Sequence, residues 1–206
     1  MRLIKTLDEI KGIKKANQII AKIYTDIIPP YLKAGITTRE IDKIIDDYIR
    51  SCGARPACIG VEGFYGPFPA ATCISVNEEV VHGIPGDRVI KDGDIVSLDI
   101  VTELDGYYGD SAKTFAIGEI DEESRKLLEV TEKSREIGIE AAVVGNRLGD
   151  LGHAIQSYVE KNGFSVVRDF AGHGVGLDLH EEPMIPNYGR KWNGLSNRTY
   201  GKCWNI

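Results

Sequence analysis

The fold is decided by a stretch of 23 residues, which reads Asp94-Ile-Val-Ser-Leu-Asp-Ile-Val-Thr-Glu-Leu-Asp-Gly-Tyr-Tyr-Gly-Asp-Ser-Ala-Lys-Thr-Phe-Ala116. Residues 94–103 and 107–116 are rich in β-branched and aromatic side chains, which is typical of strands. Between them, Asp105-Gly106 is a strong signal for a two-residue turn, because a type I′ turn needs positive φ at both positions. The stretch therefore predicts a long antiparallel hairpin.

The hairpin predicts that two aspartates lie on one face of a sheet. If Leu104 pairs with Tyr107, counting back places Val101 opposite Asp110. Side chains alternate along a strand, so Asp99 and Asp110 become diagonal neighbours, about 7–8 Å apart at Cα. Two carboxylates this close repel each other unless a proton or cation lies between them, and the apolar neighbours of Asp99 disfavour a merely exposed pair. The pair predicts a divalent metal ion with oxygen ligands.

Amphipathic helices flank the hairpin on both sides. Capping boxes at Thr6-x-x-Glu9 and Thr37-x-x-Glu40 predict two helix starts, each followed by apolar residues at helical spacing. A second helix pair is predicted from residue 121 to residue 163, with a break at Gly145. Further strands are expected over residues 72–81 and after Gly163, and Asn77-Glu78-Glu79 marks a turn. Helices and antiparallel strands in this order predict an α+β domain.

The second helix of each pair repeats the same pattern at an offset of 110 residues. Apolar residues and glycines agree in type and spacing, which indicates two structurally related halves. The six matches are Gly35 with Gly145, Ile41 with Leu151, Ile45 with Ile155, Tyr48 with Tyr158, Ile49 with Val159 and Gly53 with Gly163.

Composition and charge exclude several classes of protein. The 206 residues are 42% hydrophobic and 27% charged, and the net charge of −6 disfavours a general nucleic-acid binder. No run approaches the roughly 18 apolar residues of a membrane helix, and the N-terminus has acids where a signal peptide is apolar. We therefore expect a cytoplasmic protein with no membrane and no specific nucleic-acid partner. None of the four cysteines forms a C-x-x-C pair, which favours free thiols.

Three of the four histidines lie beside glycine or proline in turn-like segments. They are His82 in Val81-His82-Gly83-Ile84-Pro85, His173 in Gly172-His173-Gly174, and His180 in His180-Glu-Glu-Pro183. Glycine neighbours let a ligand approach the backbone closely, and imidazole binds transition metals. Each histidine alone is equally compatible with a structural role.

Taken in order, these motifs resemble those of the type I methionine aminopeptidases. The resemblance rests on Cys73-Ile-Ser-Val-Asn-Glu-Glu-Val-Val-His82-Gly-Ile-Pro, the two aspartates eleven residues apart, the glycine-rich His173 motif and the His180 motif. It covers residues 1–191 and implies the pita-bread fold, an antiparallel sheet covered by two pseudo-symmetric helix pairs. It also implies metal-dependent hydrolytic removal of N-terminal methionine from nascent proteins and peptides.

The resemblance also implies a site. In the family, two divalent ions (cobalt, manganese, iron or zinc) share five protein ligands, of which Asp99, Asp110 and His173 match three. His82 matches a histidine near the scissile amide, and His180 matches one that helps to polarise the substrate carbonyl. The candidates for the pocket around the methionine side chain are Cys58, Tyr65, Phe68 and Cys73.

The resemblance does not continue through residues 192–206. This segment shows neither strand alternation nor a helical period, and the family's two glutamate ligands and last strands have no counterpart in it. A one-base shift after Lys191 would permit the Gly-Thr-Gly that the family shows there, so truncation or a frameshift is a hypothesis. We expect an incomplete domain over residues 1–191, an aberrant tail, one metal ion or none, and little or no activity.

The expected substrate is the N-terminal methionine of a nascent polypeptide, met near the ribosome, and the expected state is a monomer. Two alternatives stay open. A proline-directed aminopeptidase of the same fold is disfavoured by Val81-His82-Gly83-Ile84-Pro85 and by the compact N-terminus. A non-catalytic pita-bread binding protein is disfavoured because such proteins usually lose the ligands that Asp99, Asp110 and His173 retain.

Overall fold

The computed structural model describes residues 4–63, 66–195 and 204–205. The chain divides into two compact units, which we describe separately. The hairpin unit comprises Asp8–Asp121 and Gly176–Leu179, and the C-terminal unit comprises Met1–Leu7, Glu122–Val175 and His180–Ile206. In the described part of the chain, no helix combines the length and the apolar character needed to cross a membrane.

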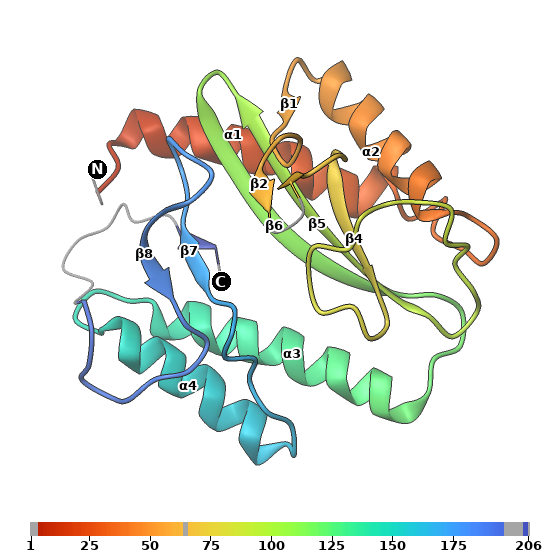
Figure 1. The fold of residues 1–206 in the computed structure, drawn as a ribbon. Coiled ribbons are helices and arrows are strands. Elements are labelled where there is room, and N and C mark those ends of the chain that lie inside the picture. The colour runs from red at the N-terminus through yellow and green to blue at the C-terminus, as the bar shows by residue number, and fades with distance from the viewer. Residues whose placement is uncertain (1–3, 64–65, 196–203, 206) are drawn as a thin grey trace. The chain divides into compact units, whose positions relative to one another are not determined.

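The hairpin unit is built on an antiparallel sheet around the predicted hairpin (Figure 1). The pairing of Leu104 with Tyr107 confirms the turn at Asp105-Gly106, whose φ angles are 53° and 81°. Two shorter strands pair antiparallel with β5, one over each half of it. The strands are β1 (Arg55–Pro56), β4 (Thr72–Val76), β5 (Ile95–Leu104) and β6 (Tyr107–Ala116), with a separate two-stranded ribbon of β2 (Glu62–Gly63) and β3 (Gly66–Pro67).

Strand β4 is shorter than the sequence predicts. The strand ends at Val76, so the prediction of a strand to residue 81 is wrong, whereas the predicted turn at Asn77-Glu78-Glu79 is confirmed by the φ of 56° at Asn77. The Asn77 side chain holds this turn, since its Nδ2 donates to Asp94 Oδ1 at 2.9 Å and its Oδ1 accepts from the Ile95 amide at 2.9 Å. The loop that carries His82 therefore begins five residues before the histidine.

Two helices cover one face of this sheet. They are α1 (Leu7–Lys22), which continues as the π-helical turn η1 (Ile23–Ile27), and α2 (Thr38–Ser51). The first helix begins directly after Thr6, as predicted. The second capping box is confirmed in both directions: the Thr37 amide donates to Glu40 Oε2 at 2.8 Å, and the Glu40 amide donates to Thr37 Oγ1 at 3.2 Å.

The main core lies between these helices and the sheet. Alternate residues of β5 face the helices, so Val96, Leu98 and Ile100 are all 0% exposed. The backbone of α1 approaches β6 closely at Gly109, where a Cβ atom would lie 2.8 Å from the carbonyl carbon of Ala16. This close packing holds the helix face of the hairpin rigidly and leaves the opposite face for other side chains.

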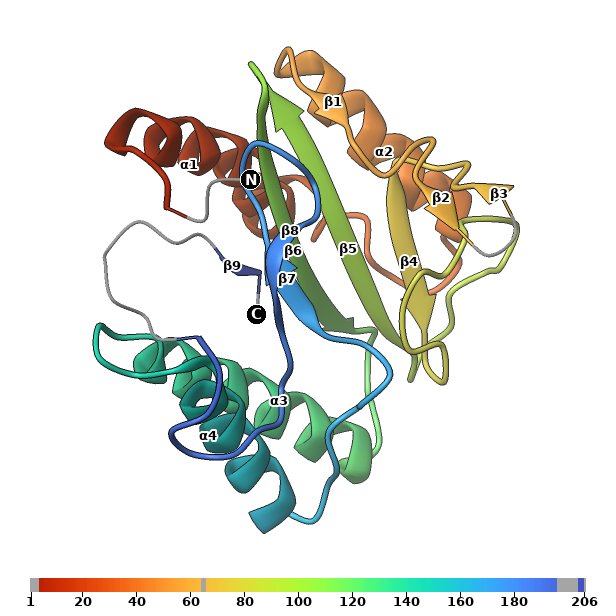
Figure 2. The same cartoon turned by 60° about the vertical axis from the view of Figure 1, so that its left-hand side comes forward.

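The C-terminal unit contains a second helix pair and a small sheet (Figure 2). Helices α3 (Glu122–Ala141) and α4 (Leu148–Lys161) enclose a core that includes Val130, Leu151 and Ile155. The sheet has the order β8-β7-β9. Its strands are β7 (Gly172–Gly174), β8 (Glu181–Ile185) and β9 (Trp204–Asn205).

One expectation about the C-terminal unit is wrong, and one short strand has no signal in the sequence. Residues 164–170 lie in the described chain and form no strand; Phe164 and Val166 instead pack on the α3–α4 core, which explains their alternation. The tail shows no strand pattern in sequence, yet Trp204 pairs with Gly174. Ladder pairing uses backbone groups, so a two-residue strand needs no alternation of side chains.

The predicted repeat is confirmed residue by residue. Helices α2 and α4 both have 14 residues and begin 110 positions apart, at Thr38 and Leu148. The glycines that precede them have φ angles of 99° and 102°, and the glycines that follow have 75° and 88°. Each half therefore contains the same helix pair, as the pita-bread fold requires.

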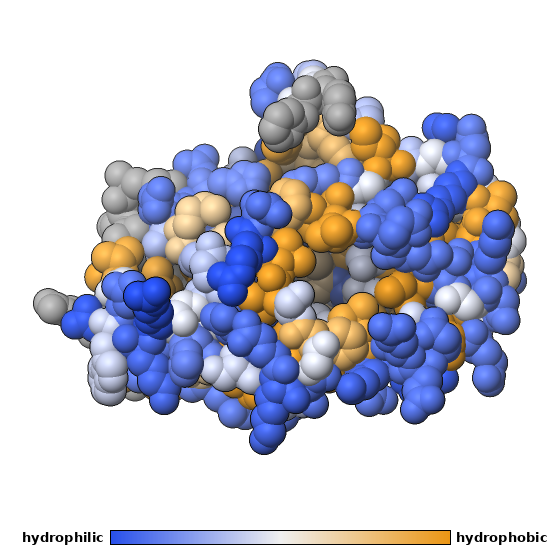
Figure 3. Space-filling model, turned by 60° about the horizontal axis from the view of Figure 1, so that its bottom comes forward, coloured by the Kyte–Doolittle hydropathy of each residue, from blue (hydrophilic) through white to orange (hydrophobic). Residues whose placement is uncertain are grey.

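The face shown in Figure 3 carries many hydrophilic side chains, with hydrophobic side chains gathered in places between them. Large exposed apolar residues of the C-terminal unit include Ile139, Val143 and Val144, which are 46–52% exposed. Exposed apolar side chains of this kind are ordinary on folded proteins and carry no functional conclusion.

Candidate active site

The two predicted carboxylates lie on the face of the hairpin that is turned away from the helices. Val101 pairs with Asp110 and Asp99 pairs with Ala112, which confirms that Asp99 and Asp110 are diagonal neighbours on one face. Both side chains are half-buried. Carboxylate oxygens are the ligands that manganese and similar divalent ions prefer, so the donor set of this face fits such an ion.

A buried pair of thiols lies beside the carboxylates. Cys73 stands directly opposite Asp99 in the β4–β5 ladder, and Cys58 and Cys73 are each 6% exposed in one cluster with Val101. The hydrogen bond with Cys58, together with burial, raises the pKa of the Cys73 thiol far above its ordinary value. Cys73 therefore stays a neutral thiol at pH 7, which suits a pocket wall better than a metal site, because metals bind thiolates.

Two further pocket residues were predicted, Phe68 and Tyr65, and the structure places Phe68 in this cluster. Phe68 is half-buried and packs against the cluster of Cys58 and Cys73. Its backbone is held by Val61, whose carbonyl accepts from the Phe68 amide at 2.8 Å. Tyr65 lies outside the described residues. The structure thus gathers three of the four predicted pocket residues beside the carboxylate pair.

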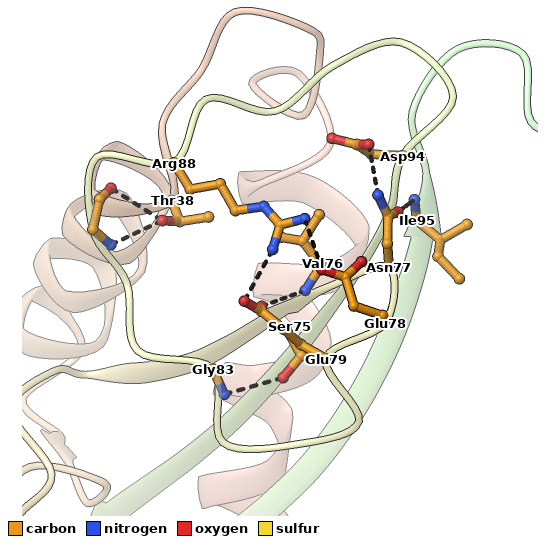
Figure 4. Close-up of polar contacts among 11 residues, drawn as sticks. Thr38, Ser75, Val76, Asn77, Glu78, Glu79, Gly83, Arg88, Asp94 and Ile95 are labelled. Atoms are coloured by element: carbon orange, nitrogen blue, oxygen red, sulfur yellow. Dashed lines mark hydrogen bonds and ion pairs between the residues drawn. The ribbon is translucent and has the colours of Figure 1, made fainter.

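His82 lies on the long loop between β4 and β5. Polar contacts hold this loop at several points (Figure 4). Glu79 accepts from Arg88 Nη1 at 2.9 Å, which links the two limbs of the loop. Between the limbs, Thr38 Oγ1 of α2 donates to the Gly86 carbonyl at 3.0 Å and accepts from the Gly86 amide at 2.8 Å. The imidazole itself is exposed, at a residue whose φ is 59°.

The residue after His82 is fixed directly on β4. The Ile74 amide donates to the Gly83 carbonyl at 2.8 Å, and the Gly83 amide donates to Ser75 Oγ at 3.1 Å. A Cβ atom at Gly83 would lie 2.1 Å from the Ile74 carbonyl oxygen, so only glycine fits. Ser75 is 4% exposed and, like Cys73, stands on the carboxylate face of β4. The loop therefore presents His82 from a fixed anchor.

The other two predicted histidines lie together in the C-terminal unit. The ring centroids of His173 and His180 are 4.5 Å apart. His173 is on β7, and its Nδ1 lies 2.9 Å from the carbonyl oxygen of Gly174. A proton on Nδ1 donates to that oxygen and leaves the lone pair of Nε2 to bind a metal, as in many histidine ligands.

A buried ion pair stands next to His180. Lys5 Nζ contacts Glu181 Oε2, and the two side chains are 2% and 4% exposed. Neither residue was a candidate in the sequence, because partners 176 positions apart leave no local pattern. Within residues 4–63 and 66–195, no three or more histidine, cysteine, aspartate or glutamate side chains are grouped so as to hold a metal ion.

The chain is similar to known proteins over most of its length. Residues 11–200 match the model of metallopeptidase family M24. The chain is 49% identical over 189 residues to methionine aminopeptidase 1 of Bacillus subtilis, covering 92% of this chain and 74% of that protein. It is 47% identical over 195 residues to the methionine aminopeptidase of Clostridium acetobutylicum, covering 94% and 76% of the two chains.

Solved structures agree with the sequence comparison. The crystal structure of methionine aminopeptidase from Rickettsia prowazekii superposes with a TM-score of 0.92 at 38% identity, covering 98% of this chain and 79% of that one. A prolidase from Pyrococcus furiosus gives a TM-score of 0.78 at 26% identity, covering 92% and 54%. These likenesses, together with the confirmed hairpin and repeat, show that the chain belongs to metallopeptidase family M24 and, within it, to the methionine aminopeptidases.

Proposed function

We propose that this chain hydrolyses the peptide bond that follows an N-terminal methionine, using the face of the hairpin that carries Asp99 and Asp110. The observation that carries the proposal is the diagonal arrangement of two half-buried carboxylates beside a buried thiol cluster. The carboxylates suit a cation, and the thiol cluster with Phe68 suits the methionine side chain, because a thioether packs well against sulfur and aromatic groups.

Each candidate residue has an assigned task in this proposal. Asp99 and Asp110 hold divalent metal through oxygen, and His173 contributes its Nε2. A bound metal supplies Lewis acidity and a water of lowered pKa. His82 lies near the scissile amide, and His180 helps to polarise the substrate carbonyl. The methionine side chain is received by Cys58, Cys73 and Phe68, with Tyr65 as a further candidate.

Metal-dependent release of methionine from a Met-Ala-Ser peptide tests the proposal. Residues 1–206 contain three of the five ligands that the family uses, so we expect slow turnover, lost on chelation and restored by manganese or cobalt. Asp110→Asn should abolish the metal-dependent part. Asp105→Asn is the matched control: it makes the same change in the same hairpin, and Asn-Gly also favours a type I′ turn. Equal turnover in both variants would refute the assignment of Asp110.

Substrate choice separates the proposal from its alternatives. We expect release from Met-Ala and none from Ala-Pro; the reverse preference would indicate a proline-directed enzyme. Manganese binding that is identical in the wild type and Asp110→Ala would favour a non-catalytic module. The family resemblance also supports a monomer that meets nascent chains near the ribosome in the cytoplasm, which size-exclusion chromatography and ribosome sedimentation would test.

A further inference from the structure

A tyrosine on the helix face of the sheet supports the backbone next to both carboxylates. Tyr24 is 7% exposed, and its hydroxyl donates to the carbonyl oxygens of Leu98, at 3.0 Å, and Ser111. Leu98 directly precedes Asp99, and Ser111 directly follows Asp110. A single hydroxyl therefore joins β5 and β6 at the place where the carboxylates project from the opposite face.

Tyr24 is held in place by the π-helical turn η1. The amide of Ile28 donates to the carbonyl of Ile23 at 3.0 Å, which is the i→i+5 bond of a π-turn. Ile23 and Ile28 are both 0% exposed, so the core fixes both ends of this turn. The Tyr24 ring lies against Phe115 of β6, with ring centroids 6.1 Å apart. The hydroxyl is thus presented by a rigid element, and π-turns recur at functional sites.

The two carbonyls act on the carboxylates through planar peptide groups. The Leu98 carbonyl belongs to the peptide group that contains the Asp99 nitrogen, so its direction fixes one side of the Asp99 backbone. The Ser111 carbonyl belongs to the group that leads to Ala112, which is the partner of Asp99 in the ladder. Holding both oxygens sets the separation and tilt of the strands at this point. Ligand distances in metal sites must be correct to about 0.2 Å, so small changes of tilt matter.

We propose that Tyr24 is a positioning residue that sets the geometry of the Asp99–Asp110 pair and thereby its affinity for a divalent cation. The inference rests on the proposed function, in which these carboxylates bind metal. Tyr24 acts through the Leu98 and Ser111 carbonyls, from the face of the sheet opposite to the substrate.

The test compares two variants that each remove one buried hydroxyl between the first helix and β5. Tyr24→Phe removes the donor to Leu98 and Ser111 and keeps the ring in the core. Thr102→Val is the matched control, because Thr102 is 0% exposed and its Oγ1 donates to the Ala16 carbonyl at 3.0 Å. Manganese is titrated into the metal-free 206-residue chain by calorimetry. We expect the Kd to rise about tenfold in Tyr24→Phe and less than twofold in Thr102→Val.

A second measurement needs no metal. The carboxylate ¹³C resonances of Asp99 and Asp110 in the metal-free protein should move in Tyr24→Phe and stay in place in Thr102→Val. Equal manganese affinity and equal resonances in the two variants would overturn the inference. If Asp99→Asn and Asp110→Asn bind manganese as tightly as the wild type, the proposed metal site fails instead, and the resonances alone decide whether Tyr24 positions the pair.

Discussion

Lys5 and Glu181 form a buried ion pair, and its removal should affect stability differently when one partner or both partners are replaced. The side chains are 2% and 4% exposed, so solvent screens their charges little. Removing one partner of a buried pair leaves an uncompensated charge and costs about 3–5 kcal/mol, whereas replacing both with apolar residues is often neutral. We therefore expect Lys5→Met and Glu181→Leu each to lower the free energy of unfolding by about 3–5 kcal/mol, and the double variant to recover most of that loss.

Urea denaturation followed by circular dichroism measures these differences, and the melting temperature of each single variant should fall by about 6–20 °C. Lys11→Met is the matched control. It breaks a pair with Asp8 whose side chains are 72% and 88% exposed, so its effect should stay below about 0.5 kcal/mol. A double variant that loses as much stability as the two single variants together would refute the reasoning, because the stabilisation would then come from packing of the two stems and not from mutual neutralisation.

Three further predictions concern single residues. Burial raises the pKa of Asp42 to about 6, so the folded state holds this proton more tightly than the unfolded state, and stability falls as the pH rises from about 4 to 6. Asparagine at position 42 cannot ionise, so Asp42→Asn avoids this loss. Its free energy of unfolding, measured in urea, should exceed that of the wild type by a margin that grows to about 1 kcal/mol by pH 7, a figure reduced for solvent screening of a half-buried group. Gly83→Ala should cost about 1–3 kcal/mol, because its Cβ meets the β4 backbone, whereas Gly86→Ala has open space and should be near neutral in the same measurement. Gly149→Ala places a Cβ 2.3 Å from the Arg190 carbonyl oxygen, and we expect a similar loss, seen as a lower melting temperature.

The sequence predicts the hairpin and its carboxylates because both follow from local rules. Asp105-Gly106 fixes the turn, the turn fixes the register, and strand alternation then places Asp99 and Asp110 on one face. The capping box at Thr37 is equally local, since its two hydrogen bonds span three residues. No later step of folding has to be known for these features.

The support around the site is not predictable in this way. Tyr24 lies 74 positions before Leu98, and nothing in the apolar period of its helix distinguishes a π-turn from an ordinary helix end. Ser75 lies on the predicted strand, but its bond to the Gly83 amide depends on how the intervening loop returns. A sequence pattern shows which residues are buried, whereas these contacts depend on the three-dimensional path of the chain between them.

The repeat explains why Asn193 and Leu195 accept backbone hydrogen bonds although residues 192–195 are exposed and have no regular sequence pattern. In the first half, the amides of Thr38 and Arg39 at the start of α2 donate to the carbonyls of Arg88 and Gly86, at 3.0 and 2.9 Å. In the second half, 110 positions later, the amides of Leu148 and Gly149 at the start of α4 donate to the carbonyls of Leu195 and Asn193, also at 3.0 and 2.9 Å.

The acceptors of the two halves are separated by a constant 107 positions, so the same two-bond arrangement serves both helices. Helix N-termini leave amides that need acceptors, and backbone carbonyls can meet that need whatever side chains accompany them. The segment whose carbonyls accept from the first amides of α2, residues 86–88, also follows His82 in the loop between β4 and β5. The corresponding segment at α4, residues 193–195, has a sequence with no strand alternation. The two halves therefore share the same backbone hydrogen bonds although the side chains of the two segments differ.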